Sequence, residues 1–230
     1  MNAPLPRRLA AELLGTFALV FAGTAAIVVN DVSGGAITHL GISLVFGLVV
    51  LALIYALGDV SGCHINPAVT LGFVAARRFP LSEAGAYIAA QISGALLASV
   101  MLVAMFPGHS TLGATLPHGA AMQSFLLEVI LTWFLMFVIL CVSTGAKEKG
   151  ITAGIAIGAV IGLEALFAGP ICGASMNPAR SIAPALISGK IDSLWIYLAA
   201  PILGALLAIP CCRCVQQPGC CSSVSTEPCR

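Results

Sequence analysis

The sequence predicts an all-α membrane protein with six transmembrane helices and two re-entrant half-helices, arranged as two inverted repeats. Three observations predict this class. Hydrophobic residues make up 59% of the 230 residues and charged residues only 8%, whereas a soluble domain has about a quarter of its residues charged. Several apolar runs approach the roughly 20 residues that a bilayer crossing requires. Two Asn-Pro-Ala segments, at 66–68 and 177–179, interrupt this apolar chain.

Six apolar runs are the predicted spans, and no polar stretch between them is long enough for a soluble domain. We therefore expect residues 1–210 to form one transmembrane domain. The first run carries Glu12 and lacks a clear small-residue cleavage site after it, so we interpret it as a span and not as a cleaved signal. In chain order the runs are Leu9–Val29, Leu40–Leu57, Ala84–Met105, Ala120–Val142, Ile151–Ala168 and Leu194–Ile209.

Three landmarks recur along the chain at similar spacing. Glu12 and Glu128 are 116 residues apart, the two Asn-Pro-Ala segments are 111 apart, and the segment G-A-L-L-A occurs twice, 110 residues apart. These offsets indicate an internal duplication, with repeats at about 9–106 and 120–210. Each half holds three spans, an odd number, so the second half must be inverted in the membrane, as in many transport proteins.

The basic residues predict the orientation. If all six runs cross, only Arg180 and Lys190 lie on one side of the membrane. The other eight lie on the opposite side: Arg7, Arg8, Arg77, Arg78, Lys147, Lys149, Arg213 and Arg230. The positive-inside rule places both termini in the cytoplasm. We expect a multi-pass protein of a plasma or inner membrane.

The two Asn-Pro-Ala segments have the residues of a helix start inside the membrane. Asn66 and Asn177 are suitable N-caps, and each precedes a proline, which suits the first helical position. Irregular backbone at membrane depth is tolerated where it is buried in protein or lines a cavity. Two half-helices entering from opposite faces would bring the asparagines together, with each side-chain NH2 left as a donor.

This arrangement favours neutral solutes. Each helix N-terminus presents about half a positive charge, which attracts a water or hydroxyl oxygen and opposes cations and proton relay. The sequence shows no nucleophile–base pair and no metal cage. We therefore expect no enzyme activity, no cofactor and no nucleic-acid partner.

The motifs S-G-C-H-I-N-P-A-V-T and G-A-S-M-N-P-A-R-S, with the two span glutamates, resemble those of the aquaporins, the major intrinsic proteins, and the resemblance covers Ala11 to Ile209. It implies a homotetramer in membrane lipid with a pore in each subunit. It also assigns roles to residues of this chain. These are central donors Asn66 and Asn177; a selectivity filter of Phe46, Ala165, Ala174 and Arg180; wall carbonyls of Gly62, Cys63, His64, Gly173, Ala174 and Ser175; and loop-holding Glu12 and Glu128.

Two positions depart from the family patterns. Ala165 stands where strict water channels usually have His, which should widen the filter, and Ser181 stands where glycerol facilitators usually have Asp. Our hypothesis is passage of water and of small neutral solutes such as ammonia, urea, hydrogen peroxide or metalloid hydroxides. Cys63, three residues before Asn66, is either a mercurial-sensitive thiol at the pore wall or simply a small apolar residue.

Other features leave alternatives open. Glu164 has no assigned role. A coupled secondary transporter also uses inverted repeats and broken helices, but it needs an ion site in the core. A third class is a membrane enzyme or metal-sensing receptor that uses the Cys-rich tail, residues 211–230. The tail has three further interpretations: it binds a soft metal or arsenite, it is acylated, or it is disordered and binds no ligand. Its cysteines are Cys211, Cys212, Cys214, Cys220, Cys221 and Cys229.

Overall fold

The structure, a computed structural model, describes residues 3–143 and 147–216. These ranges contain eight helices and no strand. Six of the helices are long and apolar enough to cross a membrane, and each overlaps one predicted run. The predicted class, six spans with two half-helices, is therefore confirmed. The helices are α1 (Leu5–Val32), α2 (Thr38–Ser61), α3 (Pro67–Ala75), α4 (Leu81–Met105), α5 (Ala121–Val142), α6 (Lys147–Cys172), α7 (Pro178–Ser188) and α8 (Leu194–Val215).

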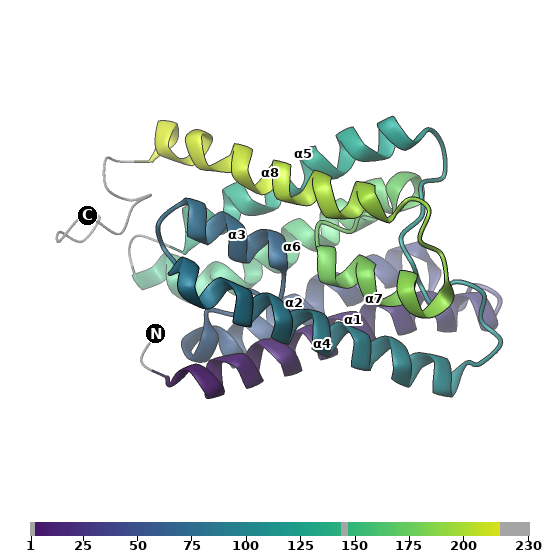
Figure 1. The fold of residues 1–230 in the computed structure, drawn as a ribbon. Coiled ribbons are helices and arrows are strands. Elements are labelled where there is room, and N and C mark those ends of the chain that lie inside the picture. Colours follow the sequence, from purple (N-terminus) through teal and green to yellow (C-terminus); the bar gives the residue numbers. More distant parts are fainter. Residues whose placement is uncertain (1–2, 144–146, 217–230) are drawn as a thin grey trace.

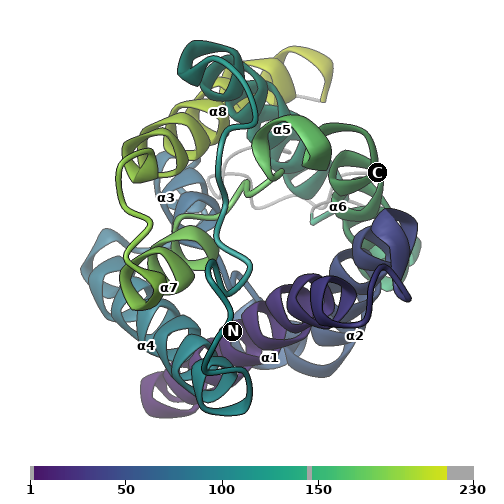
Figure 2. The same cartoon turned by 90° about the vertical axis from the view of Figure 1, so that its right-hand side faces the viewer.

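The six long helices lie around one bundle axis, and the short helices α3 and α7 lie toward opposite ends of it, each in contact with α4 and α8 (Figures 1 and 2). Within each half the first span packs against the third, α1 against α4 and α5 against α8, and α2 packs against α6 between the halves. Each half-helix also contacts the third span of the other half, α3 with α8 and α7 with α4. The start of α1 and the end of α8 lie at the same end of the molecule (Figure 1).

A glycine allows the close contact between the first and third spans in each half. A Cβ atom on Gly94 would clash with the carbonyl oxygen of Leu13, and one on Gly204 would clash with that of Val129. These glycines are 110 residues apart, and their partners each follow one of the two span glutamates. The inverted halves therefore repeat the same backbone contact.

The helices α2 and α6 cross backbone to backbone. A Cβ on Gly47 would lie 2.7 Å from the carbonyl oxygen of Gly158, and one on Gly158 would lie 2.6 Å from that of Gly47. Gly162 lies beside the same crossing. Small residues at helix interfaces let backbones approach in this way inside a membrane. The backbone of α2 at Gly47 consequently has no room to move toward α6.

The helix α6 continues past the predicted end of the fifth span. It passes through Pro170, which has no N–H to bond the carbonyl of Leu166. The Nε2 atom of His39, from the start of α2, lies 2.7 Å from that carbonyl oxygen. A side chain from another helix thus supplies the partner that the proline removes.

The helix α8 also extends beyond the predicted sixth span, to Val215. Cys211, Cys212 and Cys214 therefore belong to its last turns, and the boundary predicted for the tail is wrong at this point. The remaining tail cysteines lie outside the described residues. Within the described ranges, no group of three or more His, Cys, Asp or Glu side chains is placed to hold a metal ion.

Candidate functional site: a polar track through the helix bundle

The two asparagines cap the half-helices as their positions before proline require. The Oδ1 atom of Asn66 accepts a hydrogen bond from the backbone N–H of Ala68 at 2.8 Å. The Oδ1 atom of Asn177 accepts from Ala179 at 3.0 Å and from Arg180 at 3.3 Å. Both asparagines have extended backbone angles, typical of an N-cap. The caps fix both amide groups at the point where the half-helices meet.

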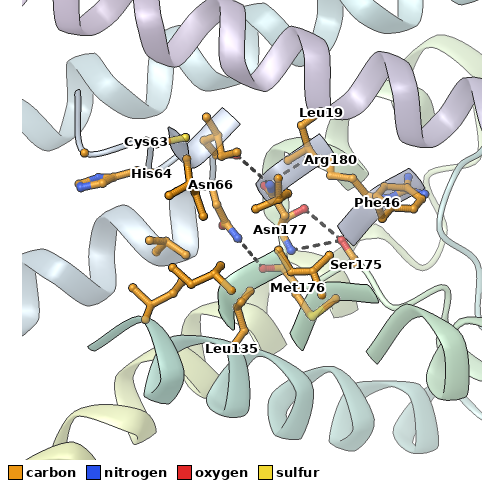
Figure 3. Close-up of a pocket in the computed structure, with 18 of the residues that line it drawn as sticks. Leu19, Phe46, Cys63, His64, Asn66, Leu135, Ser175, Met176, Asn177 and Arg180 are labelled. Atoms are coloured by element: carbon orange, nitrogen blue, oxygen red, sulfur yellow. Dashed lines mark hydrogen bonds between the residues drawn. The ribbon is translucent and has the colours of Figure 1, made fainter. Parts of the chain in front are cut away.

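Each asparagine also donates a hydrogen bond to the opposite segment. The Nδ2 atom of Asn66 donates to the carbonyl of Met176 at 2.8 Å, and that of Asn177 donates to the carbonyl of Ile65 at 2.9 Å (Figure 3). The sequence predicts each side-chain NH2 as a donor for the pore. An amide nitrogen carries two hydrogens, so this crossed pair uses one and leaves the other for the cavity that both side chains border.

Glu12, wholly buried in α1, holds the first segment. Its carboxylate accepts from two consecutive backbone N–H groups of the loop and from two side chains of α2 and α4. The donors are Ser61 Oγ at 2.7 Å, His64 N at 2.9 Å, Ile65 N at 2.6 Å and Gln91 Nε2 at 2.8 Å. A buried carboxylate needs such partners, because leaving water without them is costly.

Glu128, wholly buried in α5, holds the second segment in the same manner. It accepts from the backbone N–H groups of Ser175 at 2.7 Å and Met176 at 2.8 Å. The order of the contacts repeats that of Glu12, which also binds the two residues before an asparagine. The two glutamates therefore occupy equivalent places in the inverted halves.

Both loops are held in a strained backbone conformation. Cys63 and Ile65 have φ of 48° and 43°, and Ala174 and Met176 have φ of 42° and 54°. Left-handed conformations cost roughly 1–2 kcal/mol for each such residue. Strained residues persist only where their surroundings hold them in place. The glutamate bonds and the asparagine caps provide that restraint.

A cavity of about 140 Å³ runs past the asparagine pair, which corresponds to about five waters at the roughly 30 Å³ that each occupies in the liquid. Most of its polar groups come from the two re-entrant segments and most of its apolar wall from the long helices (Figure 3). The apolar wall includes Leu19, Val50, Ile54, Leu135, Ile139, Ile157 and Ile161. A solute in this cavity meets hydrogen-bonding groups on one side and hydrocarbon on the other.

Arg180, in the first turn of α7, lies at one end of the cavity and is 2% exposed. Its Nη1 donates to the carbonyl of Gly113 at 2.8 Å, and its guanidinium carbon lies 5.1 Å from the ring centre of Phe46. Its Nε has no hydrogen-bond partner among the described residues. Ala165 and Ala174 also border the cavity. The structure thus brings all four predicted filter residues to one cavity.

A chain of hydroxyl groups connects the loop between the halves to the second segment. Thr115 Oγ1 bonds Ser181 Oγ at 2.7 Å, Ser181 Oγ bonds Ser175 Oγ, and Ser175 Oγ donates to the carbonyl of Asn177 at 3.0 Å. Sequence reasoning missed Gly113 and Thr115 as site residues. They lie in an ordinary polar loop, and no local pattern marks them.

The predicted wall residues mostly border the cavity. Gly62, Cys63, His64 and Ser175 do so, but Gly173 is not among the cavity residues. It lies against Thr115, where an added Cβ would be 3.1 Å from that side chain. An added Cβ does not report the direction of the carbonyl group, so the carbonyl of Gly173 stays a predicted part of the wall.

The ring of His64 is packed among aromatic side chains and has a structural role. Its Nδ1 lies 3.2 Å from Thr70 Oγ1, and its ring packs against those of Phe73, Phe79 and Tyr87 at centre distances of 4.8 to 5.3 Å. Aromatic packing and one polar contact account for the side chain. The backbone at this residue is the part held by Glu12.

Glu164 is wholly buried in α6, and neither of its carboxyl oxygens has a hydrogen-bond partner among the described residues. It is not one of the residues that border the cavity, although its neighbour Ala165 is. Consecutive helical residues point about 100° apart, which explains the difference. The structure gives Glu164 no place in the polar track.

Comparison with known proteins identifies the architecture. Residues 2–210 match the family model described as "Major intrinsic protein". The chain is 48% identical to aquaporin NIP1-1 of Oryza sativa subsp. japonica over 206 residues, 89% of this chain and 72% of the relative. It is 47% identical to nodulin-26 of Glycine max over 207 residues, 90% of this chain and 76% of the relative.

A solved structure agrees with these relatives. The X-ray structure of the aquaglyceroporin from Plasmodium falciparum superposes with a TM-score of 0.78 at 26% identity, covering 91% of this chain and 95% of that one. With six apolar helices, the chain is an integral multi-pass membrane protein. It belongs to the major intrinsic protein family, whose members are passive channels and not enzymes.

Proposed function

We propose that this chain is a passive channel for water and small neutral solutes that excludes ions and protons. The crossed asparagine pair carries the proposal, because Asn66 and Asn177 each keep one amide hydrogen for a cavity that continues on both sides of them. A water oxygen at this point can accept from both amides. A water bound in this way cannot also accept a proton from the next water, so we expect the chain of proton transfer to be interrupted.

Three positive features oppose cations along the same route. The N-termini of α3 and α7 meet at the asparagines, and each carries about half a unit of positive charge. Arg180 adds a full charge at one end of the cavity. Among the described residues that border the cavity, no side chain is a carboxylate that could bind a cation directly. A neutral solute avoids this repulsion and still finds hydrogen-bonding groups.

The side chains at the filter support passage of solutes wider than water. Two of the four filter residues, Ala165 and Ala174, carry only a methyl group. The resemblance to an aquaglyceroporin and to aquaporins is consistent with either a broad or a narrow range. We propose ammonia, urea, hydrogen peroxide and metalloid hydroxides as the solute class, with Phe46 and Arg180 forming the polar and aromatic side of the filter.

We also propose that both termini are cytoplasmic and that four copies assemble. The start of α1 and the end of α8 lie at the same end of the bundle, as an even number of spans requires (Figure 1). Most of the basic residues follow the distribution that the positive-inside rule describes. The proposed filter then faces outward.

Stopped-flow light scattering on reconstituted vesicles tests the proposal. We expect fast water flux, measurable urea flux, and no increase in proton conductance over protein-free vesicles. Rapid proton leakage, or water flux no faster than in protein-free vesicles, would contradict the channel. Water flux with no flux of any neutral solute would contradict only the wider range.

The same vesicles test the alternative, a coupled secondary transporter. Coupling needs an ion or proton site in the core. The carboxylates of Glu12 and Glu128 both accept hydrogen bonds from loop backbone N–H groups, and Glu164 is not among the residues that border the cavity. Flux that saturates with concentration or follows a proton gradient would favour the transporter.

A further inference from the structure

We propose that Gly23, in the middle of α1, is a specificity-determining residue because it seats the ring of Phe46 at the wall of the filter. The inference rests on the proposed function, in which Phe46 forms one side of the filter. Gly23 touches no solute in this account. It acts by leaving space for the aromatic ring that does.

The contact between Gly23 and Phe46 is closer than any side chain at Gly23 permits. A Cβ at Gly23 would lie within 2.7 Å of three carbons of the Phe46 ring. An ordinary Cβ contact begins at 3.4 Å. The nearest ring carbon would lie only 2.1 Å from this Cβ, so the ring would have to move by about 1.3 Å (3.4 Å less 2.1 Å) to accept a single methyl group. In the present sequence it occupies the space that a methyl group would fill.

The two helix backbones cannot easily separate to relieve this contact. On one side, the next residue of α2, Gly47, already lies against the backbone of Gly158 in α6. On the other side, Thr24 of α1 is packed by the loop between the halves, since a Cβ on Gly113 would lie 3.1 Å from its Cα. The Phe46 side chain is the movable group, and its free side is the cavity.

Moving the ring changes the filter in two ways. It brings carbon atoms into the cavity, which narrows the route for a solute. It also shifts the surface on which the Arg180 guanidinium rests at 5.1 Å. Both effects act at the filter, some distance from the asparagine pair. A wide solute such as urea should lose more permeability than water.

The test compares Gly23→Ala with wild type in vesicles, measuring urea and water permeability on the same preparation. We expect the urea-to-water ratio to fall roughly tenfold, the lower end of the discrimination that one methylene group gives in a pocket. The matched control is Gly85→Ala in α4, where an added Cβ meets nothing within 4 Å. It makes the same change in helix propensity and should leave the ratio unaltered.

Two further variants attribute the effect to the ring. Phe46→Leu alone should raise the ratio, and adding Gly23→Ala to it should cause no further change, because the displaced ring is gone. If Phe46→Leu leaves the ratio unchanged, the proposed filter is wrong at that residue. If Phe46→Leu raises the ratio but Gly23→Ala does not lower it, only the inference on Gly23 is overturned.

Whether each variant folds also tests the proposed contact between Gly23 and the Phe46 ring. Should Gly23→Ala fail to fold while the double variant with Phe46→Leu folds, the clash with the ring is supported by the rescue. Should neither fold, or should the added methyl lower the ratio equally in the Phe46→Leu background, groups other than the ring decide the effect and the inference is refuted.

Discussion

Replacing Glu128 by Gln should release the second re-entrant segment. The carboxylate accepts from two backbone N–H groups, those of Ser175 and Met176. A glutamine keeps one acceptor oxygen but turns an NH2 donor toward the other N–H, which cannot rotate away. Leaving a buried donor unsatisfied costs about 1–3 kcal/mol, and the lost bond to a charged group was worth roughly 1.5–3 kcal/mol. The two energies partly describe the same lost interaction and are not added in full, so we expect the free energy of unfolding to fall by about 3 kcal/mol.

Strain in the segment gives this loss a functional consequence. Ala174 and Met176 hold φ values of 42° and 54°, and such residues need restraint from their surroundings. With one restraint removed, the loop can relax and Asn177 can leave the crossed pair. For a protein of this size, 1 kcal/mol corresponds to roughly 2–4 °C in Tm, so Glu128→Gln should unfold about 10 °C lower in detergent and lose most water flux in vesicles.

The control for this prediction is Glu164→Gln. It makes the same chemical change in the same half, at a side chain that is also wholly buried but has no hydrogen-bond partner among the described residues. It should keep the wild-type Tm or raise it, with unchanged water flux. Equal Tm and flux in wild type and Glu128→Gln, or equal losses in both variants, would refute the reasoning.

Three further predictions concern single side chains. Mercurials should partly block water flux through Cys63, which borders the cavity, and Cys63→Ser should abolish the block; an insensitive wild type contradicts this. Ala165→His should lower urea flux more than water flux in the vesicle assay, and an unchanged ratio would contradict a filter role. His39→Ala should remove the partner of the Leu166 carbonyl and lower stability by about 1 kcal/mol; thermal unfolding measures this, and an unaltered Tm speaks against it.

The fold was largely predictable because its signals are local or repeated. Apolar runs give the spans, and the recurring Asn-Pro-Ala segments give the half-helices and the inversion. The helix ends were less predictable. The helix α6 passes through Pro170 because His39 from another helix replaces the lost bond, and no local pattern shows such a partner.

The site, like the fold, has parts that the sequence predicts and parts that only the structure reveals. The caps and the two glutamates were predictable because each lies within a motif or a matched pair of positions. Gly113, Thr115 and Gly23 were not, because their contribution depends on which distant residue lies beside them. The crossed bonds of the asparagines also required coordinates, since a side-chain NH2 gives no indication of which carbonyl it will meet.

The internal repeat also gives the proposed filter a counterpart of different chemistry in the other half. Each filter residue has a counterpart 111 positions away in the other half, and the cavity is bordered by all eight. The pairs are Phe46 with Ile157, Ala165 with Ile54, Ala174 with Cys63, and Arg180 with Val69. The inverted scaffold therefore builds two equivalent rings, one on each side of the asparagine pair, from different side chains.

Chemistry differs between the two rings although their backbones are equivalent. One ring has a cation, an aromatic face and two methyl groups, and the other has three branched aliphatic side chains and a thiol. Only the first offers a charge to repel cations and donors to replace the water that a solute loses. The side chains of the second ring can exclude a solute by size but offer no strong hydrogen bond to select it. Exchanging Val69 for Arg should therefore impose a second charged barrier and reduce neutral-solute flux, whereas exchanging Arg180 for Val should remove the charge from the entire route.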